Sequence, residues 1–123
     1  MKKWMESSVV FFPCQNQQET RDYYTNVLGL TIHQEKEGNL ILDTGYGYLG
    51  FVESVDFELP AYSCISFNCA DEAEVDALYE KFKDMKGASA PRRHPQFAVY
   101  SFFIQDPDGY TVEFQKIEKE GEQ

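Results

Sequence analysis

Apolar and polar side chains alternate over short stretches along much of the chain, and this period of two predicts strands. Strands are expected at 7–13, 30–35, 39–44, 48–54, 61–68, 97–105 and 110–117. The segment 88–96 contains two prolines and is expected to form a strand or a loop. Turn residues separate these stretches, so the pattern predicts a fold made mainly of short strands.

Two segments have helical spacing instead. Asn16 can cap a helix over about 17–28, and Gly29 can end it in a left-handed conformation. A second helix is expected within 70–87, with Asp71 as its cap. The apolar stripe of this second helix consists of Val75, Leu78, Tyr79 and Phe82.

The two halves of the chain repeat each other. A shift of 55 residues aligns Val10 with Ile65 and Cys14 with Cys69. Each half then contains a strand, a helix and three further strands. The sequence therefore predicts an α+β fold of two tandem βαβββ modules, about 7–58 and 61–117, within a single domain over 1–123. The charged tail 118–123 is expected to fray.

A tight corner joins the last two predicted strands. Asp106 can accept hydrogen bonds from backbone amides, Pro107 presets the backbone angle, and Gly109 can take the left-handed position. A tetrapeptide of this kind predicts a hairpin and, taken alone, indicates nothing about function.

The aromatic strand, the DPDGY corner and the Val-Glu-Phe strand that close this duplicated chain resemble the vicinal oxygen chelate superfamily. The segment TRDYYTNVLGLTI (20–32) is similar to that family's first-helix signature. The superfamily includes glyoxalase I, extradiol dioxygenases, fosfomycin-resistance thiol transferases and bleomycin-resistance proteins. The resemblance covers about Val9 to Ile117 and implies curved mixed sheets around a cup-shaped cavity. Because one fold hosts many activities, it implies no single function.

In the metal-dependent members of this family, a His on the first strand and a Glu on the last strand of a module hold the ion. Glu113 matches the carboxylate position, but Val9 and Cys64 stand at the histidine positions, and the fourth position falls near Gly50. Such a donor set suits the family's hard divalent metals poorly. We therefore expect no cofactor, with a divalent metal held by Glu113 and His33 or His94 as the alternative.

Strand alternation indicates which side chains face the cup. Val112 and Phe114 are expected under the helices, so Glu113 should face the cavity. The phase of the strand at 97–105 is ambiguous, because apolar residues occupy both of its faces. The predicted ligand-binding residues are Phe11, Cys64, Ser66, Asn68, Tyr100, Phe102 and Glu113, and no catalytic residue is identified.

The two histidines and their neighbours have simpler interpretations as well. His33 is expected to be a partly exposed strand residue. Arg92, Arg93 and His94 form a basic cluster that could clamp a carboxylate or phosphate, although a solvated loop is the interpretation we favour.

Charge and cysteine content exclude several classes of partner. The formal net charge of −10 disfavours nucleic acid and anionic membranes. Three cysteines without CxxC spacing argue against a disulfide framework and a structural zinc site. The N-terminal lysines precede no apolar run, so no signal peptide is expected, and a cytoplasmic location is predicted.

Together these observations predict a small-molecule-binding protein of the glyoxalase and bleomycin-resistance type without the usual metal. One alternative is a metal-dependent lyase or dioxygenase that uses Glu113. Another is a non-catalytic structural or regulatory module whose cup is filled by its own aromatic side chains. Because sheet edges need covering and family members mostly pair, a homodimer is expected.

Overall fold

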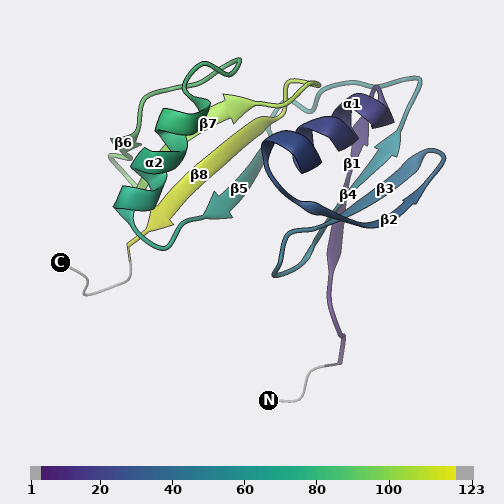
Figure 1. The fold of residues 1–123 in the computed structure, drawn as a ribbon, viewed down its shortest axis with the longest axis horizontal. Helices are drawn as coiled ribbons and strands as arrows, with labels where there is room; N and C mark the ends of the chain where they lie inside the picture. Colours follow the sequence, from purple (N-terminus) through teal and green to yellow (C-terminus); the bar gives the residue numbers. More distant parts are fainter. Residues whose placement is uncertain (1–3, 119–123) are drawn as a thin grey trace. The chain divides into compact units, whose positions relative to one another are not determined.

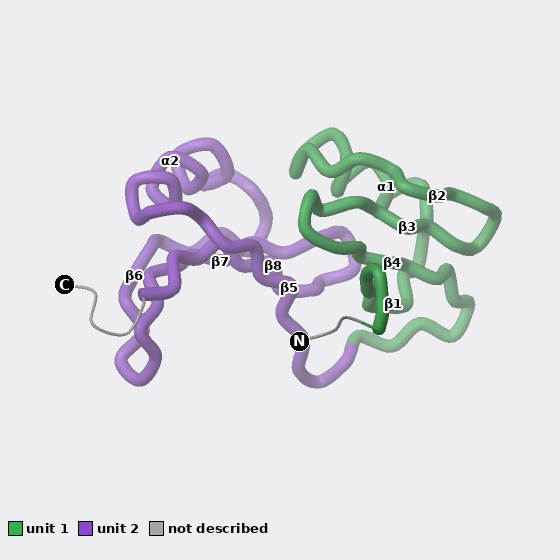
Figure 2. Tube along the Cα trace, turned by 90° about the horizontal axis from the view of Figure 1, so that it is seen from below, with its two compact units in different colours: residues 1–59 green, residues 60–123 purple. Residues whose placement is uncertain are grey.

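The computed structural model describes residues 4–118, so the expected charged tail lies outside the described residues apart from Glu118. The chain divides into two compact units between Leu59 and Pro60 (Figure 2). Each unit contains one four-stranded mixed sheet and one helical segment (Figure 1). The α+β class and the two tandem modules predicted from the repeat are therefore confirmed.

Unit 1 is ordered strand, helix and three strands. Its elements are β1 (Val9–Cys14), α1 (Gln17–Asp22), η1 (Tyr23–Val27), β2 (Thr31–Lys36), β3 (Asn39–Asp43) and β4 (Tyr48–Glu53). The sheet has the order β1-β4-β3-β2, in which β1 runs parallel to β4 and the other pairs are antiparallel. The helical segment packs on one face, where the ring of Tyr24 lies 5.0 Å from that of Phe51.

Unit 2 has the same plan. Its elements are β5 (Cys64–Asn68), α2 (Glu72–Phe82), β6 (Arg92–Arg93), β7 (Val99–Gln105) and β8 (Thr111–Ile117). The sheet order is β5-β8-β7-β6, with β5 parallel to β8. Helix α2 covers one face of β7 and β8 (Figure 1). In each unit we call the sheet face opposite the helix the open face.

The first helix differs from its prediction in its second half. Asn16 caps it as expected, because its side chain accepts a hydrogen bond from the Glu19 amide at 3.0 Å. After Asp22, however, the chain widens into the π-helical turn η1. The Thr25 hydroxyl donates to the Arg21 carbonyl at 2.7 Å, and this side-chain bond competes with the α-helical ladder. Gly29 then ends the segment with φ 77°.

The second helix is shorter than the predicted segment 70–87. Asp71 caps it by accepting from the Glu74 amide at 2.8 Å, but the helix ends at Phe82. Tight turns continue to Gly87, which has φ 76°. No helix among residues 4–118 is long and apolar enough to cross a membrane.

The predicted corner between the last two strands is confirmed. The Asp106 carboxylate, 2% exposed, accepts from the amides of Asp108 and Tyr110, both at 2.9 Å. The Gly109 amide donates to the Asp106 carbonyl at 3.0 Å, and Gly109 has φ 97°. This corner places Gln105 opposite Thr111 and so fixes the register of β7 on β8.

A stack of rings fixes which face each side chain of unit 2 occupies. Phe114 on β8 lies 5.5 Å from Phe82 of α2 and 5.2 Å from Phe102 on β7. Phe102 also meets Tyr79 of α2 edge to face and is fully buried. Phe102 therefore belongs to the helix-covered core, and its neighbour Phe103 points to the open face.

The opposite placement of these two neighbours leads to a stability prediction. We expect Phe102→Ala to lower the free energy of unfolding by about 3–5 kcal/mol, because it leaves a cavity in the core. Phe103→Ala should cost about 1 kcal/mol or less, because that ring is half-buried on the open face. Urea unfolding followed by circular dichroism measures both values, and equal losses would contradict this assignment of faces.

Candidate functional site

The open face of unit 2 carries three cross-strand rows of side chains. In the middle row Ser66 of β5 and Phe103 of β7 flank Glu113 of β8. One neighbouring row pairs Cys64 with Thr111 and Gln105, and the other pairs Asn68 with Gln115 and Ser101. Residues directly opposite each other in a sheet share a face, so these side chains line one surface.

Glu113 is the central charged group of this surface. Its Oε1 atom accepts a hydrogen bond from the Ser66 hydroxyl at 2.6 Å and a longer one from the Cys64 thiol at 3.7 Å. Among residues 4–118 its other oxygen, Oε2, has no hydrogen-bond partner. The carboxylate is thus oriented by one oxygen and can accept a donor from a bound molecule with the other.

The Cys64 thiol supports this arrangement as a neutral group. Burial raises its pKa above the ordinary value, the negative charge of Glu113 raises it further, and the hydrogen bond with Ser66 acts in the opposite direction. A thiol in such surroundings stays protonated near neutral pH and is a weak nucleophile. The chemistry of this cluster is therefore hydrogen bonding rather than covalent attack.

Several predicted site residues lie on the sheet face that strand alternation predicted for them. The side chains of Cys64, Ser66, Asn68 and Glu113 share the open face of unit 2. Asn68 accepts a hydrogen bond from the Gln115 amide group at 3.0 Å. The three cysteines are free thiols, as the absence of CxxC spacing suggested.

The placement of Tyr100 and Phe102 in the cup was wrong. The Tyr100 hydroxyl donates to Asp76 of α2 at 2.5 Å, so Tyr100 shares the helix-covered face with Phe102. The prediction failed because β7 is apolar on both faces and its alternation gives no phase. The open-face residues of β7 include Ser101 and Phe103, which sequence reasoning missed.

Unit 1 presents a different chemistry at the matching place. In unit 1 the pairing of β1 with β4 puts Phe11 opposite Gly50. The corresponding pairing in unit 2, of β5 with β8, puts Ser66 opposite Glu113. The Phe11 ring lies directly over Gly50, and a Cβ added there would be 2.4 Å from Phe11 Cδ1. Phe11 therefore lies on the open face as predicted, and its ring covers the backbone at Gly50, which has no side chain.

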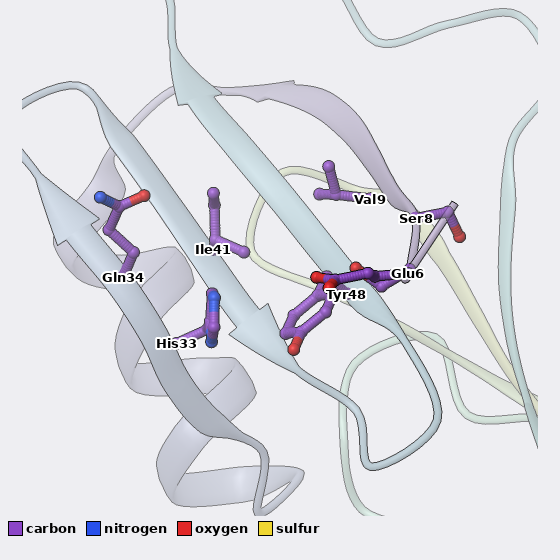
Figure 3. A pocket seen from close by; sticks show the side chains of 8 residues that line it. Glu6, Ser8, Val9, His33, Gln34, Ile41 and Tyr48 are labelled. Carbon is purple, nitrogen blue, oxygen red and sulfur yellow. The ribbon is translucent and has the colours of Figure 1, made fainter. Parts of the chain in front are cut away.

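The open face of unit 1 also contains a hollow of about 380 Å³ (Figure 3). It is lined by Glu6, Ser7, Ser8, Val9, His33, Gln34, Ile41 and Tyr48. The His33 and Tyr48 rings are 4.4 Å apart, and Figure 3 shows both beside Ile41. His33 is exposed as predicted, but its place in this hollow was not foreseen, because a bulge in β2 sets its direction.

The basic segment 92–94 of unit 2 has side chains on both faces of its sheet. Arg93 pairs with Glu72 at 2.6 Å and Glu118 at 2.7 Å, and its guanidinium lies 5.4 Å from the centre of the Tyr100 ring. The Nδ1 atom of His94 accepts from the amides of Gln96 and Phe97, so this ring organises a turn. Only Nε2 of His94 remains for any other partner.

The family's metal positions hold a set of residues that does not fit a hard divalent ion. Val9 and Gly50 provide no side-chain donor atom in unit 1, and the Phe11 ring covers Gly50. In unit 2 the donors at these positions are the soft Cys64 sulfur and the Glu113 carboxylate, and this pair alone is a poor site for a hard divalent ion. Among residues 4–118 no group of three or more His, Cys, Asp or Glu side chains could hold a metal.

Comparison with solved structures identifies the fold. An integron cassette protein from the Halifax Harbour sewage outfall metagenome has a TM-score of 0.74 at 21% identity, covering 91% of this chain and 98% of that one. A glyoxalase/bleomycin resistance protein/dioxygenase from Nocardioides has a TM-score of 0.77 at 15% identity, covering 99% and 89%. Lactoylglutathione lyase from Agrobacterium tumefaciens has a TM-score of 0.73 at 19% identity, covering 94% and 95%.

Two βαβββ units in one chain define the class of fold. The sequence comparison then assigns the chain to one superfamily within that class. Residues 8–114 match the family described as Glyoxalase/Bleomycin resistance protein/Dioxygenase superfamily. This chain therefore belongs to that superfamily, as the resemblance implied. No curated protein matches it in sequence.

The hydrogen-bonded cluster around Cys64 leads to a reactivity prediction. Glu113→Gln should raise the rate at which Cys64 is alkylated by iodoacetamide at pH 8 about threefold or more, because the variant loses a charge that raises the thiol pKa. Ser66→Ala should lower that rate, because the hydroxyl lowers the same pKa. Peptide mass spectrometry measures the labelling of each cysteine.

Cys69 is the internal control for this experiment. Burial and the Glu74 carboxylate raise the pKa of Cys69 to about 11, and neither variant touches these groups. Its slow labelling should stay unchanged in both variants. Rates at Cys64 that move in the same direction in both variants would refute the proposed roles of Ser66 and Glu113.

Proposed function

We propose that this protein binds a small organic molecule on its open sheet faces and needs no resident divalent metal to do so. The observation that carries the proposal is the state of Glu113. One oxygen is held by Ser66 and Cys64, and the other has no partner among residues 4–118. A carboxylate in this state can bind an ammonium, guanidinium or other N–H donor of a ligand.

The surroundings of Glu113 support an organic ligand. The half-buried ring of Phe103 lies directly across from the carboxylate in the sheet, and Ser66, Asn68 and Gln115 supply further polar groups. An apolar surface with a few convergent polar groups is typical of ligand sites in proteins. The net charge of −10 also favours a ligand with a positive group.

The hollow of unit 1 supports the same function by itself. Val9, Ile41 and the His33 and Tyr48 rings form part of its lining, and the other part is polar, with Glu6, Ser7, Ser8 and Gln34. A volume of about 380 Å³ lies within the range of small-molecule sites. The lactoylglutathione lyase and bleomycin-resistance names of similar proteins are consistent with small ligands.

The absence of a metal requirement can be tested by thermal unfolding. We expect Ni²⁺, Zn²⁺, Mn²⁺ or EDTA to shift the Tm of the purified protein by less than about 1 °C, because only Cys64 and Glu113 supply side-chain donors at the family's metal positions. Glu113→Gln and Glu37→Gln remove the same charge, and Glu37 lies in an exposed turn. A metal-induced rise in Tm that vanishes in the Glu113 variant but not in the Glu37 variant would favour the metalloenzyme alternative.

Ligand binding can be tested with a panel of small aromatic amines, acids and neutral alcohols. Thermal-shift hits should be richer in amines than in acids, because the unpaired Glu113 oxygen favours N–H donors. Amine hits that bind at Glu113 should lose their effect in Glu113→Gln and keep it in Glu37→Gln, whereas hits in the hollow of unit 1 should keep it in both variants. A panel without any stabilising compound would favour the alternative of a structural module.

A homodimer and a cytoplasmic location stay predictions for this chain. The homodimer follows from sheet edges that need covering and from the family resemblance, and the location follows from the N-terminal sequence and the cysteine usage. Sedimentation velocity would measure the oligomeric state directly.

A further inference from the structure

We propose that Arg92 and Glu113 together select a ligand that carries an oxyanion at one end and a nitrogen donor at the other. The inference rests on the proposed small-molecule function and specifies the class of ligand. It follows from the way in which two consecutive arginines are divided between the faces of one sheet.

The register of β6 assigns each arginine to a face. Arg93 lies opposite Tyr100, and its ion pair with Glu72 of α2 confirms that it points to the helix-covered side. Arg92 lies opposite Ser101, whose side chain belongs to the open face. Because consecutive side chains of a strand point to opposite faces, the Arg92 guanidinium shares the open face with Glu113.

The two arginines also differ in their partners. The charge of Arg93 is compensated by Glu72 and Glu118. Within the described part of the chain, the Arg92 guanidinium forms no ion pair or hydrogen bond. It is therefore a positive group that remains available to a carboxylate or phosphate, for which its planar fork of donors is well suited.

The spacing of the two charged groups sets the size of the ligand. Strands β6 and β8 are separated by β7, and neighbouring strands lie about 4.8 Å apart. Arg92 is level with Ser101, two residues along β7 from Phe103, which is level with Glu113. The two Cα atoms are thus about 12 Å apart. Because side chains stand roughly perpendicular to a sheet, one charge-assisted contact of about 2.8 Å at each end leaves about 6–7 Å between the charged ends of a ligand.

The surface between the two charges favours a compact apolar connector. Phe103 and the small side chain of Ser101 lie on β7 between Arg92 and Glu113. A flat ring could stack on Phe103 while its two ends reach the two charged groups. The ligand class is therefore a small zwitterion with an aromatic or other apolar middle.

Four probes separate the contributions of the two ends. The probe 4-(aminomethyl)benzoate has both charged groups, benzylamine has the amine, 4-methylbenzoate has the carboxylate, and benzyl alcohol has neither. Titrations monitored by ¹H–¹⁵N NMR at pH 7 give their dissociation constants. We expect the zwitterion to bind about fivefold or more tightly than either singly charged probe.

Two neighbouring variants then locate the oxyanion site. Arg92→Gln should weaken the zwitterion about fivefold and leave benzylamine unchanged. Arg93→Gln removes the same charge from the other face, so it should lower Tm and leave both affinities unchanged. Glu113→Gln should weaken the zwitterion and benzylamine alike, and leave 4-methylbenzoate unchanged.

The outcomes distinguish this inference from the proposed function. If the probes bind and Arg92→Gln has no effect on the zwitterion, the role of Arg92 is overturned and small-molecule binding stands. Loss of zwitterion binding in Arg93→Gln as much as in Arg92→Gln would also overturn it, because the effect would then be one of general charge. Absence of binding by all four probes would count against both proposals.

Discussion

The stacking of Phe82 and Phe102 on Phe114 is the contact on which the chemistry of unit 2 depends. These rings commit one face of β7 and β8 to the core beneath α2. Because consecutive side chains of a strand point to opposite faces, the next residue of each strand must point to the open face. Glu113 and Phe103 occupy the open face because their neighbours are buried, so the core determines the composition of the candidate site.

The two units show how one backbone plan can support different surfaces. Phe11 and Gly50 in unit 1 stand in the same register as Ser66 and Glu113 in unit 2. In unit 1 a ring lies over a bare backbone, and in unit 2 a hydroxyl orients a carboxylate. The duplication has preserved the pairing of the strands while the side chains have diverged, which is why membership of the superfamily does not imply its metal chemistry here.

Much of the fold could be predicted because its signals are local. The caps at Asn16 and Asp71 and the corner at Asp106 depend on side chains that bond to nearby amides. The open-face placement of Glu113 followed from clear alternation around Val112 and Phe114. The π-helical turn could not be predicted, because it reflects competition between hydrogen bonds of similar strength within the helix itself.

The main prediction that failed was the assignment of β7 side chains to the two faces of the sheet. The strand VYSFFIQ has large apolar side chains on both faces, so alternation alone cannot orient it. The length of the corner could have oriented the strand. The five residues 106–110 separate Gln105 from its partner Thr111, and two residues further from the corner on each strand Phe103 lies opposite Glu113. The hollow beside His33 needed more than counting, because a bulge in β2 interrupts the register there.

The brevity of β6 has an evolutionary consequence. Ser89 and His94 are both tied to β7 by backbone hydrogen bonds, and only four residues lie between these anchors. Insertion of one residue between Arg93 and His94, with His94 still bonded to Val99, would put Arg93 opposite Ser101 and so exchange the faces of the two arginines. Because both positions hold arginine, one guanidinium would lie on the open face in either register, so a one-residue change in the length of this segment would preserve the positive charge there.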